Sequence, residues 1–158
     1  MKFSDFVCPG AIRPQLQSSD KLGAIRELVE ALVEAGRIAE TEKESIVEAI
    51  MKREELGSTG IGRGIAVPHT KHASVSKLVG AVAVSEEGVN FDSLDGEKVQ
   101  LMFVLISPPD RPADHLRALE NISRQLRDDM FSKFLKQAKT LAEIQQLLEE
   151  ADNNQFVS

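Results

Sequence analysis

The chain has 158 residues, 42% hydrophobic and 28% charged, with a formal net charge of −6. This composition is typical of one folded globular domain, and the acidic balance argues against a nucleic-acid binder. Cys8 is the only cysteine, which excludes an intrachain disulfide framework and a cysteine-based zinc site.

Membrane and export signals are also missing from the sequence. The longest apolar run, residues 101–106, is six residues long, whereas a membrane-spanning helix needs roughly 20. The first eight residues include an acidic residue and lack the apolar core of a signal peptide. We therefore expect a cytoplasmic protein with no direct membrane insertion.

The first part of the chain predicts an edge strand followed by a helix. Residues 12–17 are extended and edge-like, because Pro14 cannot donate a hydrogen bond to a neighbouring strand. Ser19 or Asp20 then caps a helix with an apolar stripe of helical period, and Gly36 is its expected C-cap.

The middle of the chain predicts a second helix and then strands. Thr41 and Glu44 have the spacing of a capping box for a helix that ends near residue 56. Residues 78–84 and 99–106 are nearly continuous apolar runs, which indicates strands covered on both faces. Residues 86–90 are expected to turn, with a short strand at 89–91.

Three helical patterns complete the chain. Asp114 is the expected cap of the first, residues 131–135 belong to a short second one, and Thr140 with Glu143 forms a capping box for the third. The sum predicts a single α/β domain over residues 1–150, with helices at both ends of the sequence and strands between them. Residues 151–158 are polar and are predicted to form a flexible tail.

A glycine-rich segment followed by a histidine is the strongest functional signal. In residues 58–71 (STGIGRGIAVPHTK), alternating glycines allow positive φ values and close approach of the backbone to a ligand. Pro68 stiffens the segment that ends at His69. An imidazole acts as a nucleophile, base or ligand near neutral pH. A rigid histidine beside a loop rich in backbone N–H groups indicates phosphoryl chemistry.

His115 is the second candidate. It lies in the first turn of a predicted helix, where N–H groups favour anions, and it follows a strand end, where open α/β sheets bind ligands. His69 and His115 could therefore meet at one rim of the sheet. Considered by its position alone, His115 is equally well interpreted as a residue that only tethers its helix. His72 lies in a polar stretch and is expected to face solvent.

Other chemistries find little support. The Walker motif is absent, and Ile65 stands where a Gly-x-Gly-x-x-Gly pattern needs its last glycine. The chain has no His-Glu-x-x-His motif for a metal hydrolase and no Gly-x-Ser-x-Gly elbow for Ser58. We predict neither a metal nor a cofactor.

Residues 53–69 (REELGSTGIGRGIAVPH) resemble the signature of the enzyme IIA domains of the fructose/mannitol class. These domains belong to the bacterial phosphoenolpyruvate-dependent sugar phosphotransferase system and include the nitrogen-regulatory IIA proteins. The resemblance covers roughly residues 3–150, and HLRAL at 115–119 is similar to the family's second histidine motif. It implies a mixed β-sheet flanked by helices on both faces.

The resemblance also implies roles for three residues. His69 is the residue phosphorylated by the phosphocarrier HPr or a paralogue, His115 helps to bind the phosphoryl group, and Arg53 lies near the active site. Backbone or hydroxyl donors in the loop are predicted to contact the phosphate: Thr59, Gly60 and Gly62. Arg63 is expected either to face a partner or to be a solvated loop charge.

Two roles fit a IIA protein of this kind. In the regulatory role, which the Gly57–Gly62 stretch resembles more closely, phosphorylation of His69 decides which target protein is bound. In the transport role, His69 donates its phosphate to a separate IIB domain. A third interpretation is a IIA-like module that binds a partner without being phosphorylated.

Overall fold

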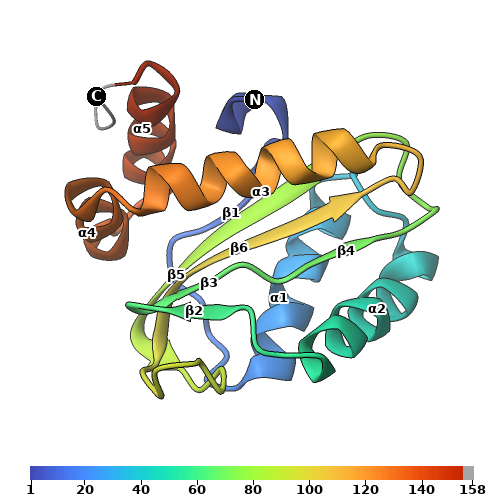
Figure 1. The fold of residues 1–158 in the computed structure, drawn as a ribbon, viewed down its shortest axis with the longest axis horizontal. Helices are drawn as coiled ribbons and strands as arrows, with labels where there is room; N and C mark the ends of the chain where they lie inside the picture. Colours follow the sequence, from blue (N-terminus) through green and yellow to red (C-terminus); the bar gives the residue numbers. More distant parts are fainter. Residues whose placement is uncertain (155–158) are drawn as a thin grey trace.

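A computed structural model describes residues 1–154 (Figure 1). Its helices, in chain order, are η1 (Phe3–Asp5), α1 (Lys21–Glu34), η2 (Glu40–Glu42), α2 (Lys43–Glu55), α3 (Pro112–Leu126), α4 (Asp129–Gln137) and α5 (Leu141–Asp152). Its strands are β1 (Val7–Arg13), β2 (Gly60–Gly62), β3 (Ile65–Ala66), β4 (His69–Lys71), β5 (Val79–Val89) and β6 (Val99–Ser107). None of the helices in this part of the chain combines the length and the hydropathy that a bilayer-spanning helix needs.

The strands form one mixed sheet in the order β1-β5-β6-β3-β2, with β4 also paired to β6. β5 and β6 are antiparallel and form the centre, and β1 runs parallel to β5 at one edge. β3 and β4 both run parallel to β6, one after the other along its length, and β2 is antiparallel to β3. The mixed sheet predicted from the family resemblance is confirmed.

Helices cover both faces of the sheet, and each face has its own apolar core. α1 and α2 pack on one face, against alternate residues of β5 and β6 such as Ala81, Val104 and Ile106. α3, α4, α5 and η1 pack on the other face, against Val82, Phe103 and the residues that alternate with the first set. Figure 1 shows α3 lying across the sheet. The near-continuous apolar character of β5 and β6 follows from this double coverage.

Some predicted element boundaries were wrong. β1 lies at an edge as expected, but it spans residues 7–13 and ends before Pro14. β5 continues into the predicted turn at 86–90 and ends at Val89, because pairing of Val89 with Val99 outweighs the local turn preference. The register shifts between Val84 and Val89, and Gly88 in this stretch has a φ of 91°. Val89 is thus the end of β5 and not part of a separate strand.

Two predicted helix caps were also wrong, and two were confirmed. Helix α2 follows the short η2 turn and has no side-chain cap from Thr41. Helix α3 begins at Pro112, two residues before the predicted cap Asp114, because proline is favoured in the first turn. The side chains of Asp20 and Thr140 do cap α1 and α5, each accepting a hydrogen bond from a backbone N–H of the first turn.

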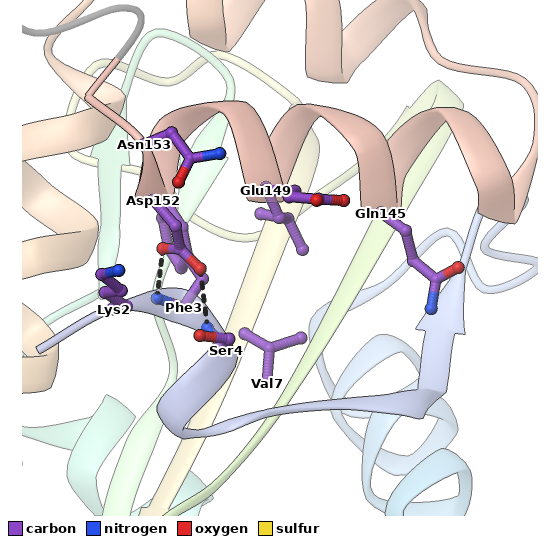
Figure 2. Close-up of a pocket in the computed structure, with 9 residues that line it drawn as sticks. Lys2, Phe3, Ser4, Val7, Gln145, Glu149, Asp152 and Asn153 are labelled. Atoms are coloured by element: carbon purple, nitrogen blue, oxygen red, sulfur yellow. Dashed lines mark hydrogen bonds between the residues drawn. The ribbon is translucent and has the colours of Figure 1, made fainter.

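Helix α5 holds the N-terminal turn of the chain (Figure 2). The Asp152 carboxylate accepts hydrogen bonds from the backbone N–H groups of Phe3, at 2.6 Å, and Ser4, at 3.0 Å. Ala151 is fully buried, so α5 extends two residues into the segment that the sequence analysis assigned to a tail. Residues 155–158 of that predicted tail lie outside the described residues.

Candidate functional site

Backbone pairing directs His69 towards α3. His69 is the first residue of β4 and lies opposite Leu105 of β6, whose side chain belongs to the core beneath α3. Pro68 separates β3 from β4, and its carbonyl still accepts a hydrogen bond from the N–H of Leu105 at 3.0 Å. The stiff segment inferred from Pro68 is therefore anchored to the central strand, and His69 has a fixed position on that face.

The structure brings His69 and His115 together. Their ring centroids are 5.5 Å apart, with an interplanar angle of 57°. His115 projects from the first turn of α3, and its Nδ1 lies 2.6 Å from Oγ of Ser107, the last residue of β6. We call His69 and His115 the histidine pair. Sequence reasoning missed Ser107, although a serine that ends an apolar strand just before the predicted helix was an available signal.

The hydrogen bond at His69 determines its tautomer. Nδ1 of His69 lies 2.8 Å from the carbonyl oxygen of Val67. A carbonyl oxygen only accepts hydrogen bonds, so Nδ1 carries the proton and Nε2 of the neutral ring keeps its lone pair. Within residues 1–154, no hydrogen-bond partner occupies Nε2. His69 thus has one tethered nitrogen and one nucleophilic nitrogen.

Both rings of the histidine pair are neutral at neutral pH. Burial lowers the pKa of His69, and the Arg53 guanidinium lowers it further, against an opposing effect of the Val67 carbonyl and of Glu54. Burial, together with the nearby His69 and Lys71, lowers the pKa of His115 to about 4. A neutral imidazole is the form that attacks phosphorus.

Arg53 supplies a positive charge near the histidine pair. It lies in the last turn of α2, and its guanidinium donates a hydrogen bond of 2.9 Å to the carbonyl oxygen of Gly57. This bond uses one of the five donors of a guanidinium and leaves the others for an anion. The side chain is partly exposed, so it can reach a ligand that arrives from solvent.

A buried ion pair stabilises the start of the glycine-rich segment. The Glu54 side chain is 2% exposed and pairs with Nζ of Lys21 at 3.1 Å. The Glu54 carboxylate also accepts hydrogen bonds from the backbone N–H and the hydroxyl group of Thr59. Lys21 Nζ lies 4.8 Å from the centre of the Phe91 ring. We call Lys21, Glu54 and Thr59 the Glu54 cluster. Sequence reasoning missed it, because a glutamate next to an arginine on a helix suggests solvent exposure.

The residues predicted to bind phosphate (Thr59, Gly60 and Gly62) make other contacts in the structure. Both donors of Thr59 are used by Glu54. The N–H of Gly60 donates to Oγ of Ser58 at 3.0 Å, and a Cβ at Gly60 would lie only 2.3 Å from Oγ of Ser93, so glycine is required there for packing. Gly62 is the last residue of β2 and lies beside the Asp95 carboxylate, which repels an anion.

His72 and Arg63 each have a side-chain partner that the sequence did not predict. His72 does not simply face solvent: Nε2 lies 2.8 Å from Oγ of Ser45 on α2, and Nδ1 lies 2.7 Å from Oγ of Ser74. Arg63 does not contact the histidine pair: its side chain is 51% exposed, as expected for a solvated loop charge, and its guanidinium pairs with Asp129 of α4, whose side chain is 88% exposed. In the part of the chain that the structure describes, His, Cys, Asp and Glu side chains form no group of three or more that could hold a metal ion.

Residues 6–151 match the family described as "Phosphoenolpyruvate-dependent sugar phosphotransferase system, EIIA 2". The chain belongs to this family. A nitrogen regulatory protein of Bradyrhizobium diazoefficiens is 35% identical over 148 residues, which cover 94% of this chain and 95% of that protein. A fructose-specific EIIA component of Haloferax volcanii is 35% identical over 130 residues, covering 82% and 83% of the two chains.

The fold of this EIIA protein is shared with solved structures. The crystal structure of nitrogen regulatory protein IIA-Ntr from Neisseria meningitidis has a TM-score of 0.82 at 27% identity, and the match covers 92% of this chain and 98% of that one. The crystal structure of IIA mannitol from Escherichia coli has a TM-score of 0.73 at 25% identity, with 88% and 96% covered. Both the regulatory and the sugar-specific branches therefore share this architecture.

Proposed function

We propose that this EIIA protein is a histidine phosphocarrier that accepts a phosphoryl group on Nε2 of His69. The observation that carries the proposal is the hydrogen bond between His69 Nδ1 and the Val67 carbonyl. It leaves Nε2 as the nitrogen with a lone pair, in a ring whose lowered pKa keeps it neutral. The donor is the phosphohistidine of HPr or of a paralogue, as membership of the phosphotransferase system suggests.

In the transfer step, the lone pair of His69 Nε2 forms a new N–P bond while the N–P bond of the donor phosphohistidine breaks. The electron pair of the broken bond returns to the donor imidazole. Positive charge that develops on the His69 ring is stabilised through its Nδ1–H by the Val67 carbonyl. Phosphoryl transfer needs mainly positioning and charge stabilisation, so neither a metal nor a nucleotide enters this step.

His115 and Arg53 stabilise the charge on the phosphoryl oxygens. The Ser107 hydroxyl lies 2.6 Å from Nδ1 of His115 and can donate to it; in that tautomer Nε2 carries the proton and donates a hydrogen bond to a phosphoryl oxygen. Arg53 offers its remaining N–H donors and a full positive charge. Because His115 is neutral, it contributes a directed hydrogen bond and Arg53 contributes the charge.

Exposed apolar side chains follow Arg53 and His115 in the sequence or lie beside Gly60, and they suit the docking of a protein donor. Leu56 is 85% exposed, Leu94 77%, Leu116 66% and Ile61 50%. Leu56 follows the helix that carries Arg53, Leu116 follows His115, and the N–H of Leu94 donates to the carbonyl of Gly60. Large apolar side chains exposed around a polar site are typical of a protein–protein interface.

The regulatory role is the one we favour, in the cytoplasm and without a sugar substrate. Its support is the likeness over nearly the full length to proteins named nitrogen regulatory protein. In this role, the phosphate on His69 changes the charge of the face that binds a target protein. The likeness to a fructose-specific EIIA component supports a second candidate, in which His69 donates its phosphate to a separate IIB domain.

Phosphotransfer in vitro tests the proposal. We expect a mixture of phosphoenolpyruvate, enzyme I, HPr or its paralogue and this protein to produce one acid-labile phosphate, and ³¹P–¹⁵N NMR to place it on Nε2 of His69. The His69→Ala variant should stay unlabelled, and the His72→Ala variant should be labelled like the wild type. Label that persists in His69→Ala, or no label with any carrier, would contradict the phosphocarrier role and favour a binding module.

The two roles differ in what removes the phosphate. We expect purified ³²P-labelled protein to keep its label when fructose- or mannitol-type IIB domains are added without a sugar-transport component. Rapid transfer of the label to such a IIB domain would instead favour the transport role. The back-transfer of label to the unphosphorylated carrier is the internal control, because it shows that the phosphohistidine remains competent.

A further inference from the structure

A second basic site lies away from the histidine pair, between α4 and the β2–β3 turn. A cavity of about 500 Å³ is lined there by four cationic side chains (Arg63, Lys133, Lys136 and Lys139) and by two carboxylates (Glu86 and Asp129). We call it the lysine pocket. An excess of cationic over anionic side chains in one pocket is unusual in a chain whose formal net charge is −6. Which of these charges form ion pairs with one another determines what the pocket can bind.

Both carboxylates of the lysine pocket already form ion pairs. Asp129 pairs with Arg63, and Glu86 pairs with Lys139 at 3.2 Å. Among the ion pairs of the described residues, none involves Lys133 or Lys136, so two positive charges of the pocket have no carboxylate partner. These lysines are three residues apart on α4, a spacing that places side chains next to one another on a helix surface.

Lys136 is the more unusual of the two. Its ammonium group donates to the backbone carbonyl of Arg63, and burial together with the Arg63 guanidinium lowers its pKa, with Asp129 opposing them. This ammonium group is partly buried and has no carboxylate within ion-pairing distance among the described residues, so an arriving anion stabilises it. Lys136 thus supplies an attraction for anions that an ordinary solvated surface lysine lacks.

The backbone at the turn keeps space open beside this ammonium group. A Cβ on Gly64 would lie 3.4 Å from Nζ of Lys136 and 3.6 Å from Oε1 of Gln100, and the φ of Gly64 is +76°. Arg63 itself has a φ of 60°, which is rare for a residue other than glycine. Its N–H donates to the Asp95 carboxylate at 3.0 Å, which together with its contacts to Asp129 and Lys136 holds the turn in place.

We propose that the lysine pocket binds a small phosphorylated metabolite that carries a diphosphate or two phosphate groups. Each of the two ammonium groups without a carboxylate partner can contact one phosphate group of such a ligand, and lysine is a common point-charge partner of phosphate. The volume is in the range of small-molecule sites. The side-chain amides of Gln100 and Gln137 line the pocket and add neutral donors for the rest of the ligand.

An NMR titration with inorganic pyrophosphate, at constant ionic strength, tests the proposal. We expect saturable shifts of the backbone amides of Arg63, Gly64 and Lys136. The Lys133→Gln/Lys136→Gln variant should bind about tenfold or more weakly. The matched control is Lys52→Gln/Lys77→Gln, which removes the same charge from two exposed lysines elsewhere and should bind within about twofold of the wild type.

Three results would overturn the proposal. The first is shifts that do not saturate, or that sulfate at the same ionic strength reproduces with equal affinity. The second is equal weakening by both double variants, because that would show only an effect of net charge. The third is shifts confined to His69, His115 and Arg53, which would assign pyrophosphate to the histidine pair. The thermal unfolding midpoint of each variant verifies that it is folded, and this test does not depend on the phosphocarrier role.

Discussion

The histidine pair and the Glu54 cluster are two polar groups beside the same glycine-rich segment, and they differ in how completely their hydrogen bonds are satisfied. In the Glu54 cluster, the carboxylate has an ammonium partner, a hydroxyl donor and a backbone donor. In the histidine pair, each ring has one nitrogen tethered, by the Val67 carbonyl or the Ser107 hydroxyl. The other nitrogen of each ring is left for a ligand.

This difference separates a structural role from a chemical one. A buried charge with all its partners stabilises one backbone conformation, since the loss of any partner leaves an unsatisfied charge. A buried imidazole with one free nitrogen retains both its nucleophilicity and its hydrogen-bond donor. His72 belongs with the first kind, because both of its nitrogens have serine partners. It is therefore an internal control for the histidine pair.

The largest expected effect is on stability and comes from the Glu54 cluster. We expect Glu54→Ala to lower the free energy of unfolding by about 3–5 kcal/mol, because it leaves Lys21, whose side chain is 15% exposed, and the two buried donors of Thr59 without their partner. Urea denaturation followed by circular dichroism measures this loss. Lys21→Ala/Glu54→Ala should recover part of it, since no unpaired charge remains. A loss below about 1 kcal/mol in Glu54→Ala would mean that the ion pair is effectively solvated.

The next effect is on the rate of phosphotransfer and concerns His115. We expect His115→Ala to slow phosphorylation of His69 by about 100-fold, because it removes a donor to the phosphoryl oxygens. The same substitution at His72 should change the rate by less than about twofold. Rapid-quench measurement of the first turnover compares the two variants. Equal rates for both would show that His115 only tethers its helix.

A smaller effect is expected on the pH dependence of stability, and it comes from His115. The pKa of His115 in the folded protein is about 4, below the ordinary value of about 6.5, so the unfolded state binds more protons between these values. The resulting stability is present above pH 6.5 and is lost as the pH falls towards 4. We expect wild type to lose about 2 kcal/mol more than His115→Gln between pH 7.5 and 4.5. Parallel pH profiles in urea would contradict the neutral state of His115.

The smallest effect is expected at His72. We expect His72→Ala to lower the free energy of unfolding by about 1 kcal/mol, the typical net value of a side-chain hydrogen bond, because α2 loses its contact through Ser45. Ser45→Ala should have a similar effect, and the double variant should cost less than the sum of the two. Strict additivity, measured by urea denaturation, would show that the two residues do not interact.

Sequence reasoning predicted the parts of the fold that depend on local patterns. The helices α1, α4 and α5 have regular apolar spacing, and Asp20 and Thr140 cap as expected. β2, β3 and β4 were not predicted, since each has three residues or fewer and is defined only by pairing within the sheet. The prediction of a turn at residues 86–90 was wrong for the same reason, because pairing with β6 overrides the local preference.

The same limit applies to the candidate site. His69, His115 and Arg53 were identified from motifs, and the structure places the two rings side by side. Thr59 was assigned to phosphate because its hydroxyl is a donor, but its actual partner is Glu54. No local pattern shows that Lys21, from another helix, makes burial of Glu54 possible. Side chains whose roles depend on a distant partner are the ones that a linear pattern cannot predict.

The contact of Asp152 with Phe3 and Ser4 also bears on how the protein is made. The hydrogen bond to Phe3 joins residues 149 positions apart in the sequence (Figure 2). During synthesis the first turn of the chain emerges early, but its partner is added only after α1 to α4 have been translated. Phe3 also stacks on Phe103 and lies against Phe131. The contacts of this aromatic side chain therefore form only after most of the chain has been synthesised. Contacts between residues so far apart in the sequence form late and slowly. We therefore expect η1 to pack against α5 only after residue 152 has left the ribosome.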